Sequence, residues 1–401
     1  MRPGDAPEYG AEEPVDLTRT GEPPRPRQAS APAEAPASHV PDNTGLATAP
    51  PVTADPANWG WRGRIRRATF GVIRPKPGHA EARYRLAEVA ARQYIGGARL
   101  VLVANPKGGS RKTTTALMLG HVFASLRGGS TVVWDNNEAR GTLAERAEIT
   151  TPATSATHLL AAFERLIGPA GSAGDMSHYL RTQPSRAEIL AAGSETERRD
   201  QIGSAETGRV GLLLSRYYRL TVMDTGTNPR SGAWQWAAQQ ADVLVVPITC
   251  DPDVVQLAVW MLDILAAIGR ADLAAGAVTV ISPSATAPDP QVRTRILEYF
   301  GARTAVVVEV PFDPQLAGGT PVVFDRTSTA SRRAWVAAAA AVADRLAARE
   351  RTRPDQMPPS PGVDPPRQGT APQPAATQGG TEHRAADSSV TELPARRAKA
   401  Q

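Results

Sequence analysis

The sequence has 401 residues, of which 41% are hydrophobic and 21% charged, with a formal net charge of +5. Its single cysteine excludes a disulfide framework and a cysteine-based zinc site, and no run of 18 apolar residues predicts a membrane-spanning helix. The charge excess is too small to require that the whole protein binds nucleic acid.

Both ends of the chain are rich in proline. Twelve of the 36 prolines lie in residues 1–57 and nine in residues 351–401. These segments carry few aromatic residues, so we predict disordered tails. The N-terminus also lacks the apolar core of a signal peptide, which favours a soluble, cytoplasmic protein. The 293 residues between the tails are enough for one large α/β domain.

Residues 58–98 are predicted to form a basic, aromatic and partly helical extension. Residues 58–99 hold ten basic and two acidic side chains, and helical spacing predicts a helix over 80–94. Arginines alternate with tryptophans and aliphatic residues in 58–76, a pattern that suits contact with non-specific DNA or with an anionic membrane surface. Alternatively, the apolar side chains pack on the protein's own domain while the arginines stay in water.

From residue 99 onward, short apolar runs alternate with helical patterns. Strands are predicted at 99–105, 130–135, 217–224, 242–249, 277–282 and 305–311, and helices at 113–126, 232–240, 253–268, 289–300 and 330–350. Residues 140–215 are less regular and are predicted to pack as helices beside the sheet. Continuous apolar strands separated by helices predict an α/β fold with a doubly wound, mostly parallel sheet.

The strongest signal is a glycine-rich loop between the first strand and the first helix of this domain. It reads Asn105-Pro106-Lys107-Gly108-Gly109-Ser110-Arg111-Lys112-Thr113-Thr114. Backbone N–H groups and a helix dipole that converge on one point suit a polyphosphate. We predict that Lys112 neutralises the β- and γ-phosphates, that the Thr113 hydroxyl binds Mg²⁺, and that Thr114 touches the α-phosphate. A simple glycine turn would not require this order of strand, loop, Lys-Thr and helix.

A second lysine separates this loop from an ordinary P-loop. The sequence KGGSRKTT resembles the KGGxGK[ST][ST] loop of the deviant Walker A ATPases of the ParA/MinD type. In that family the first lysine reaches across an ATP-sandwiched dimer to the partner's phosphates. The resemblance implies a P-loop NTPase fold over 99–350, ATP and Mg²⁺ as cofactors, and a homodimer in the ATP state. It makes Lys107 the signature lysine and Lys112 the Walker A lysine, and it places the whole loop from Lys107 to Thr114 against the nucleotide.

Two further stretches resemble motifs of the same family. Asp135, in VVWDNN, takes the first position of its DxD motif, with Asn137 in the second, and Asp224 ends the strand LTVMD like a Walker B aspartate. The resemblance implies catalytic roles for Lys107, Asp135 and Asp224. It also implies a magnesium site of Thr113, Asp135 and Asp224, all hard oxygen ligands.

The chain departs from the family pattern in three places. Arg111 replaces the glycine before the Walker A lysine, Asn137 removes a carboxylate that helps relatives to position water, and Ser282 stands where relatives often place an adenine-reading asparagine. Val310–Pro314 lies near the expected base-binding edge. These departures favour nucleotide binding over rapid turnover, hence an ATPase that is slow without an activating partner.

The resemblance implies an ATPase that positions or partitions cargo, such as a plasmid, a chromosome region or a transfer apparatus. Such a protein works in the cytoplasm, at the nucleoid or at a membrane, with an activating protein that the sequence does not identify. The stretch DNNEARGTL and the proline-rich tails resemble an actinobacterial branch of the family, some members of which serve specialised secretion. The alternatives are therefore a secretion-associated regulatory ATPase and a nucleotide-binding scaffold that hydrolyses ATP weakly.

Overall fold

The computed structural model describes residues 55–137, 141–193, 202–284 and 286–351. The tails that we predict to be disordered lie outside these ranges, apart from residues 55–57 and 351.

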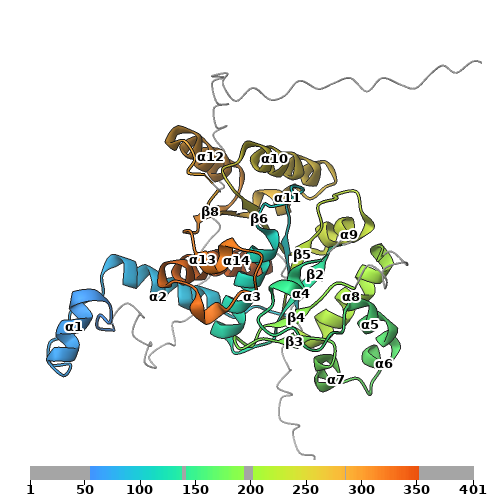
Figure 1. Ribbon diagram of the computed structural model, residues 1–401, viewed down its shortest axis with the longest axis horizontal. Helices are drawn as coiled ribbons and strands as arrows, with labels where there is room; N and C mark the ends of the chain where they lie inside the picture. The colour runs from blue at the N-terminus through green and yellow to red at the C-terminus, as the bar shows by residue number, and fades with distance from the viewer. Residues whose placement is uncertain (1–54, 138–140, 194–201, 285, 352–401) are drawn as a thin grey trace, which may run out of the picture. The chain divides into compact units, whose positions relative to one another are not determined.

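An eight-stranded sheet carries the described part of the chain (Figure 1). Its strands are β1 (Arg99–Val103), β2 (Thr131–Asn136), β3 (Arg181–Thr182), β4 (Glu188–Leu190), β5 (Leu220–Thr225), β6 (Val243–Ile248), β7 (Val278–Ile281) and β8 (Val306–Glu309). Their order is β3-β4-β2-β5-β1-β6-β7-β8, and every neighbouring pair is parallel except β3 with β4. The sheet is doubly wound, as predicted, because the chain builds outward from β1 in both directions.

Helices cover both faces of this sheet (Figure 1). The helices of the described chain are α1 (Gly60–Ala68), α2 (His79–Arg92), α3 (Lys112–Arg127), α4 (Leu143–Arg146), α5 (Ala156–Ala161), α6 (Phe163–Ile167), α7 (Ala173–Ser177), α8 (Ser204–Tyr217), α9 (Gly232–Gln240), α10 (Pro252–Ala267), α11 (Ala271–Ala275), α12 (Pro290–Arg303), α13 (Pro314–Ala317), the 3₁₀ helix η3 (Phe324–Arg326) and α14 (Thr329–Arg351).

Alternate residues of each inner strand enter two different hydrophobic clusters. In β1, Val101 and Val103 join the cluster that includes residues of α3 and α14, whereas Leu102 joins the cluster that includes residues of α8, α9 and α10. In β2, Val133 and Trp134 divide between the clusters in the same way. Side chains alternate between the faces of a strand, so a strand buried on both faces must be apolar throughout. This explains why the central strands read as continuous apolar runs.

The strands and helices predicted from residue 99 onward are confirmed, with shifts of a few residues at their ends. The prediction for 140–215 is wrong in one respect. Besides α4 to α8, this region forms β3 and β4 at one edge of the sheet, where β4 pairs with β2 and β3 turns back against β4. Strands of two and three residues are too short to show a periodic pattern.

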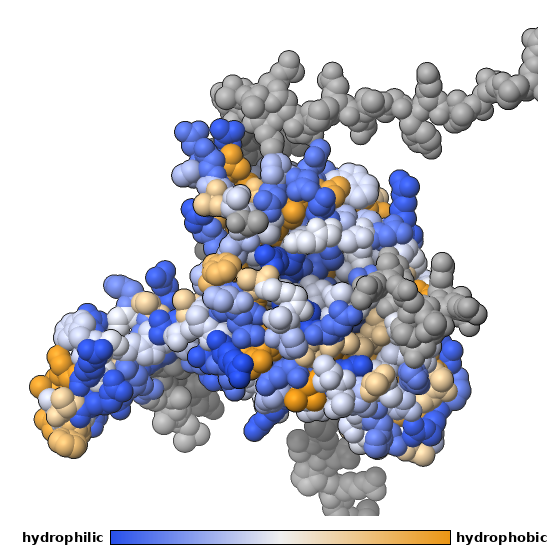
Figure 2. Space-filling view, in the orientation of Figure 1, coloured by the Kyte–Doolittle hydropathy of each residue, from blue (hydrophilic) through white to orange (hydrophobic). Residues whose placement is uncertain are grey.

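The predicted helix at 80–94 is α2, which packs along α14 and α3. Its Ala91 lies in the same hydrophobic cluster as β1 and α3. Ahead of it, α1 buries only Gly63. Figure 2 shows hydrophobic residues on the surface around the end of α1.

Candidate nucleotide site

The predicted site lies where the central parallel strands end. Strand register places Asp224, on β5, beside both Val103 of β1 and Asp135 of β2. The loop 104–111 leaves β1 at the same edge and enters α3. In a doubly wound sheet, the carboxyl edge near the central strand is where ligands bind. The fold thus brings the loop and the two acids together.

Asn105, the first residue of the motif, anchors the loop to the sheet. The buried Asn105 amide donates to the Pro247 carbonyl at 2.9 Å, and its side-chain oxygen accepts from the Lys107 N–H at 2.9 Å. Asn105 therefore ties the loop to β6. The sequence motif assigns Asn105 no role, although a polar residue directly after a buried apolar strand indicates a buried hydrogen bond.

The glycines leave open space above the loop. Gly109 has φ +79°, and a Cβ at Gly108 or Gly109 would meet no atom within 4 Å. Helix α3 begins at Lys112, so the first-turn N–H groups that lack intrahelical partners point toward this space. This arrangement fits a phosphate group.

Lys112 is a buried cation within the loop. Its Nζ donates to the Lys107 carbonyl at 2.9 Å and lies 3.5 Å from the Ser110 hydroxyl. Among the described residues, no carboxylate forms an ion pair with it. Burial lowers the pKa of Lys112, and the charge of Asp224 opposes this effect. A polyphosphate would supply the missing negative charge.

Thr113 and Asp224 form the part of the site that fits a cation. The Thr113 hydroxyl donates to Asp224 Oδ2 at 2.6 Å, while Oδ1 of the same carboxyl is buried with no hydrogen-bond partner in the described structure. Burial, followed by repulsion from Asp135, raises the pKa of Asp224 to about 7. An unpartnered carboxylate oxygen beside a hydroxyl fits Mg²⁺, whose charge would favour the ionised acid.

Asp135 lies one strand farther from the loop than Asp224. Its oxygens accept from the N–H groups of Asn137 and Leu143, each at 3.2 Å. A Cβ at Gly141 would lie 2.1 Å from Asp135 Oδ2. A side chain at position 141 would therefore displace the Asp135 carboxyl, a constraint that no motif of the sequence indicates. The structure brings Asp135 beside Asp224. The hydrogen bonds of Asp135, however, go to the backbone of the segment that follows β2.

Lys107 forms an ion pair outside the loop. Its Nζ lies 2.7 Å from Oδ2 of Asp253, in the first turn of α10, and its side chain is 39% exposed. The hydrogen bond from Lys107 is the main cause of a lowered pKa at Asp253. The predicted signature lysine is thus accessible and held by a residue that the sequence reasoning did not identify.

Arg111 has the left-handed conformation of the glycine that it replaces. Its φ is 70° and its ψ 23°, and its guanidinium donates to the Ala317 carbonyl at 3.3 Å. Arg111 and Thr114 line a small pocket together with Ser282 and residues 310–313. The segments that we expected at the base-binding edge therefore do lie beside the loop. Within them, Asp313 serves α13 and α14, accepting from the N–H groups of Gln315 and Ser328.

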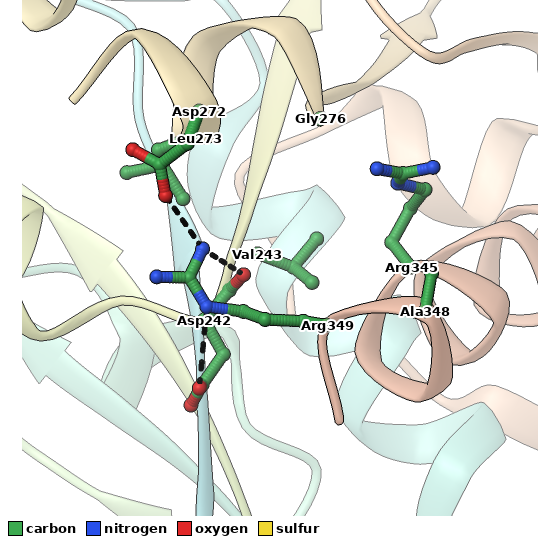
Figure 3. A pocket seen from close by; sticks show the side chains of 8 residues that line it. All are labelled: Asp242, Val243, Asp272, Leu273, Gly276, Arg345, Ala348 and Arg349. Carbon is green, nitrogen blue, oxygen red and sulfur yellow. Dashed lines mark hydrogen bonds and ion pairs between the residues drawn. The ribbon is translucent and has the colours of Figure 1, made fainter. Parts of the chain in front are cut away.

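A separate cavity of about 330 Å³ lies at the amino ends of β6 and β7, away from these residues (Figure 3). There Arg349, on α14, donates to Asp272 at 2.9 Å and lies 3.9 Å from an oxygen of Asp242. Asp242 also accepts from the Leu100 N–H at 2.9 Å. These charges compensate one another and join α14 to the sheet.

No family model matches the chain. Among curated proteins, it is similar to the ESX-1 secretion-associated protein EspI from two strains of Mycobacterium tuberculosis. Each is 26% identical over 257 residues, which is 62% of this chain and 37% of the relative. The chain thus spans little more than a third of the length of these relatives.

Solved structures with a similar fold include ATPases of the ParA and MinD kind. A ParA family ATPase from Chlorobium tepidum is 14% identical, with a TM-score of 0.48 over 61% of this chain and 98% of its own. The cell division ATPase MinD from Pyrococcus furiosus is 15% identical, with a TM-score of 0.48 over 62% and 99%. MinD from Pyrococcus horikoshii, solved with Mg-ADP, is 14% identical, with a TM-score of 0.47 over 60% and 94%.

Proposed function

We propose that the chain is a P-loop ATPase of the ParA/MinD type that binds Mg-ATP and cycles between a monomer and an ATP-sandwiched dimer. One observation carries this proposal. At the carboxyl edge of the sheet, a buried Lys112 lacks a carboxylate partner and a buried oxygen of Asp224 lacks any hydrogen bond within the described chain. Each needs a charge that Mg-ATP supplies.

The described residues divide the work of binding and hydrolysis. Bound Mg²⁺ would supply charge that neutralises the transferring phosphoryl group. Lys112 would hold the β- and γ-phosphates, while Thr113 and Asp224 would hold the metal. Lys107, once it leaves Asp253, would reach the partner's phosphates. Ser282 and residues 310–313 would border the base.

Hydrolysis is proposed to be slow without an activating protein. Asn137 cannot take a proton from an attacking water as a carboxylate does. Arg111 places a side chain in a loop where glycine would let the backbone approach the phosphates closely. A partner that supplies or orients catalytic groups would raise the rate.

Two uses of this cycle fit the observations. The resemblance to ParA and MinD proteins supports the positioning or partitioning of cargo. The curated relatives, which are named as secretion-associated, favour a second candidate, a regulatory ATPase of a specialised secretion system. No helix that the structure describes is long and apolar enough to span a bilayer. In either use, we propose action in the cytoplasm, at the nucleoid or at a membrane surface.

A Lys107→Ala variant tests the dimer cycle. We expect it to bind ATP within about threefold of the wild-type affinity, since the Lys107 side chain pairs with Asp253 outside the loop, but to remain monomeric. Calorimetry measures the affinity, and light scattering with Mg-ATP measures the mass. Lys76→Ala, which removes an exposed lysine elsewhere, serves as the matched control. Normal ATP-dependent dimerisation of Lys107→Ala would show that the lysine does not act across a dimer.

A steady-state ATPase assay separates the cycle from a passive scaffold. We expect slow basal turnover that requires Mg²⁺. Turnover indistinguishable from a Lys112→Ala variant would favour the scaffold.

A further inference from the structure

Residues 57–75, which we call the arm, form a closed segment ahead of α2. The N–H of Ala57 donates to the Pro75 carbonyl at 2.8 Å and closes the base. The buried carboxylate of Glu81, on α2, accepts from the N–H groups of Asn58 at 2.7 Å and Trp59 at 3.3 Å. The arm is therefore fixed at its base to α2.

One tryptophan of the arm packs on the domain. The ring of Trp59 lies 5.1 Å from that of Tyr84, and the guanidinium of Arg333, on α14, lies 3.5 Å from the Trp59 ring centroid. The packing alternative from the sequence therefore holds for Trp59. It fails for Trp61, Phe70, Val72 and Ile73, whose side chains are exposed.

The tip of the arm, residues 69–73, presents apolar side chains to solvent. Phe70 is 97% exposed, Val72 85% and Ile73 52%. This turn is ordered by its own hydrogen bonds. The Thr69 hydroxyl donates to the Ile65 carbonyl at 2.9 Å and accepts from the Ile73 N–H at 3.3 Å. Three neighbouring apolar residues are thus displayed on a structured turn that no described part of the chain covers.

Positive charge surrounds this apolar tip. Residues 57–75 contain no acidic side chain and five basic ones, Arg62, Arg64, Arg66, Arg67 and Arg74. The exposed side chains of Arg64 and Arg67 make no hydrogen bond or ion pair with other described residues. The arm therefore combines exposed apolar area with free cations on one segment.

We propose that the arm docks on an anionic lipid bilayer. Phe70, Val72 and Ile73 enter the boundary between headgroups and acyl chains, while Arg64 and Arg67 contact lipid phosphates. Duplex DNA offers the same phosphate charge to the arginines, but it accepts exposed apolar side chains only by insertion between base steps, which costs unstacking and kinks the duplex. The tip therefore selects lipid over DNA. Docking does not require the nucleotide cycle.

The test uses the full chain and three ligands, measured by co-sedimentation or anisotropy. These are vesicles of phosphatidylcholine with phosphatidylglycerol, vesicles of phosphatidylcholine alone, and a short DNA duplex. We expect binding to the anionic vesicles only. A triple variant, Phe70→Ser, Val72→Ser and Ile73→Ser, should lose at least about tenfold in affinity. Because all three side chains are exposed, we expect the variant to fold normally, and circular dichroism checks this. A loss of binding would then not be due to unfolding.

A charge variant probes the second half of the contact. Arg64→Gln with Arg67→Gln should weaken binding by roughly thirtyfold at low salt, and this loss should shrink at high salt. Val292→Ser and Arg219→Gln, which change exposed residues elsewhere, are the matched controls and should bind like the wild type.

A spectroscopic readout places the tip directly. The sequence holds one cysteine, Cys250, and it is buried, so Val72→Cys creates a single accessible thiol for an environment-sensitive dye. Its emission should shift to the blue on addition of anionic vesicles. Unchanged emission, wild-type vesicle binding by the triple serine variant, or binding to DNA without binding to anionic vesicles would each overturn the proposal.

Discussion

The two ends of the same sheet differ in how their charged side chains are paired. At the amino end, Arg349 and Asp242 pair with each other and with neighbouring groups. At the carboxyl end, Lys112 has only neutral partners and Asp224 keeps an unbonded oxygen in the described structure. Unpaired buried charge destabilises a fold. Lys112 and Asp224 form no ion pair with any described residue, which indicates that a ligand completes this carboxyl end (the ligand end), whereas the ion pairs of the amino end support the fold.

The largest expected effect tests the ligand end directly. Lys112→Ala should weaken ATP binding at least about a hundredfold, because truncating one member of a buried charge pair costs about 2–5 kcal/mol. Thermal stability without nucleotide should change little, since the lysine has no ionic partner there. Calorimetry and thermal unfolding measure the two quantities. Unchanged affinity with a large loss of stability would reverse the assignment of this end.

An Asp→Asn substitution should change the stability of the apoprotein in opposite directions at the two ends of the sheet. Folding raises the pKa of Asp224 to about 7, so its ionised form destabilises the apoprotein above the unfolded value near 4. Asp224→Asn should therefore stabilise the apoprotein at pH 8, by on the order of 2–4 kcal/mol. The gain should fade as the pH falls through 7 and disappear below about 4.

Asp242→Asn is the matched change at the amino end. It removes the charge that faces Arg349 and Arg99 and should destabilise the protein by about 1–3 kcal/mol. Denaturant unfolding of both variants at pH 8, without nucleotide or Mg²⁺, gives the comparison. A loss of stability in both would mean that the ends do not differ. With Mg-ATP present, only Asp224→Asn should lose ligand-induced stabilisation.

Local sequence patterns predicted most residues of the nucleotide site. The residues that hold the loop in place come from distant parts of the chain, and the patterns did not predict them. The loop, its lysines and the strands that carry Asp135 and Asp224 each have a short sequence signature. Asn105 and Lys107 depend on partners that lie more than 140 positions away, Pro247 and Asp253. Such contacts follow from the order of the strands, which periodicity does not give. Strands β3 and β4 were missed because two or three residues are too few to show an alternating pattern.

The smallest expected effect concerns Arg111, where the ligand end departs from its own motif. A side chain with φ near 70° costs about 1–2 kcal/mol, and glycine avoids this cost. The guanidinium donates to the Ala317 carbonyl, and both residues line the pocket that includes Ser282. The side chain is therefore engaged by the protein itself. We therefore expect Arg111→Gly to raise nucleotide affinity or turnover, by up to about tenfold.

Arg111→Ala separates strain from charge, because alanine keeps the Cβ and removes the guanidinium. If strain dominates, Arg111→Gly should exceed Arg111→Ala in stability by about 1 kcal/mol, and Arg111→Ala should gain no turnover. If the guanidinium acts on the γ-phosphate, both variants should lose turnover at unchanged affinity. Steady-state ATPase rates beside calorimetric affinities distinguish these results. Equal losses in both variants would make Arg111 a catalytic group, and the strained loop would then be the cost of placing its charge.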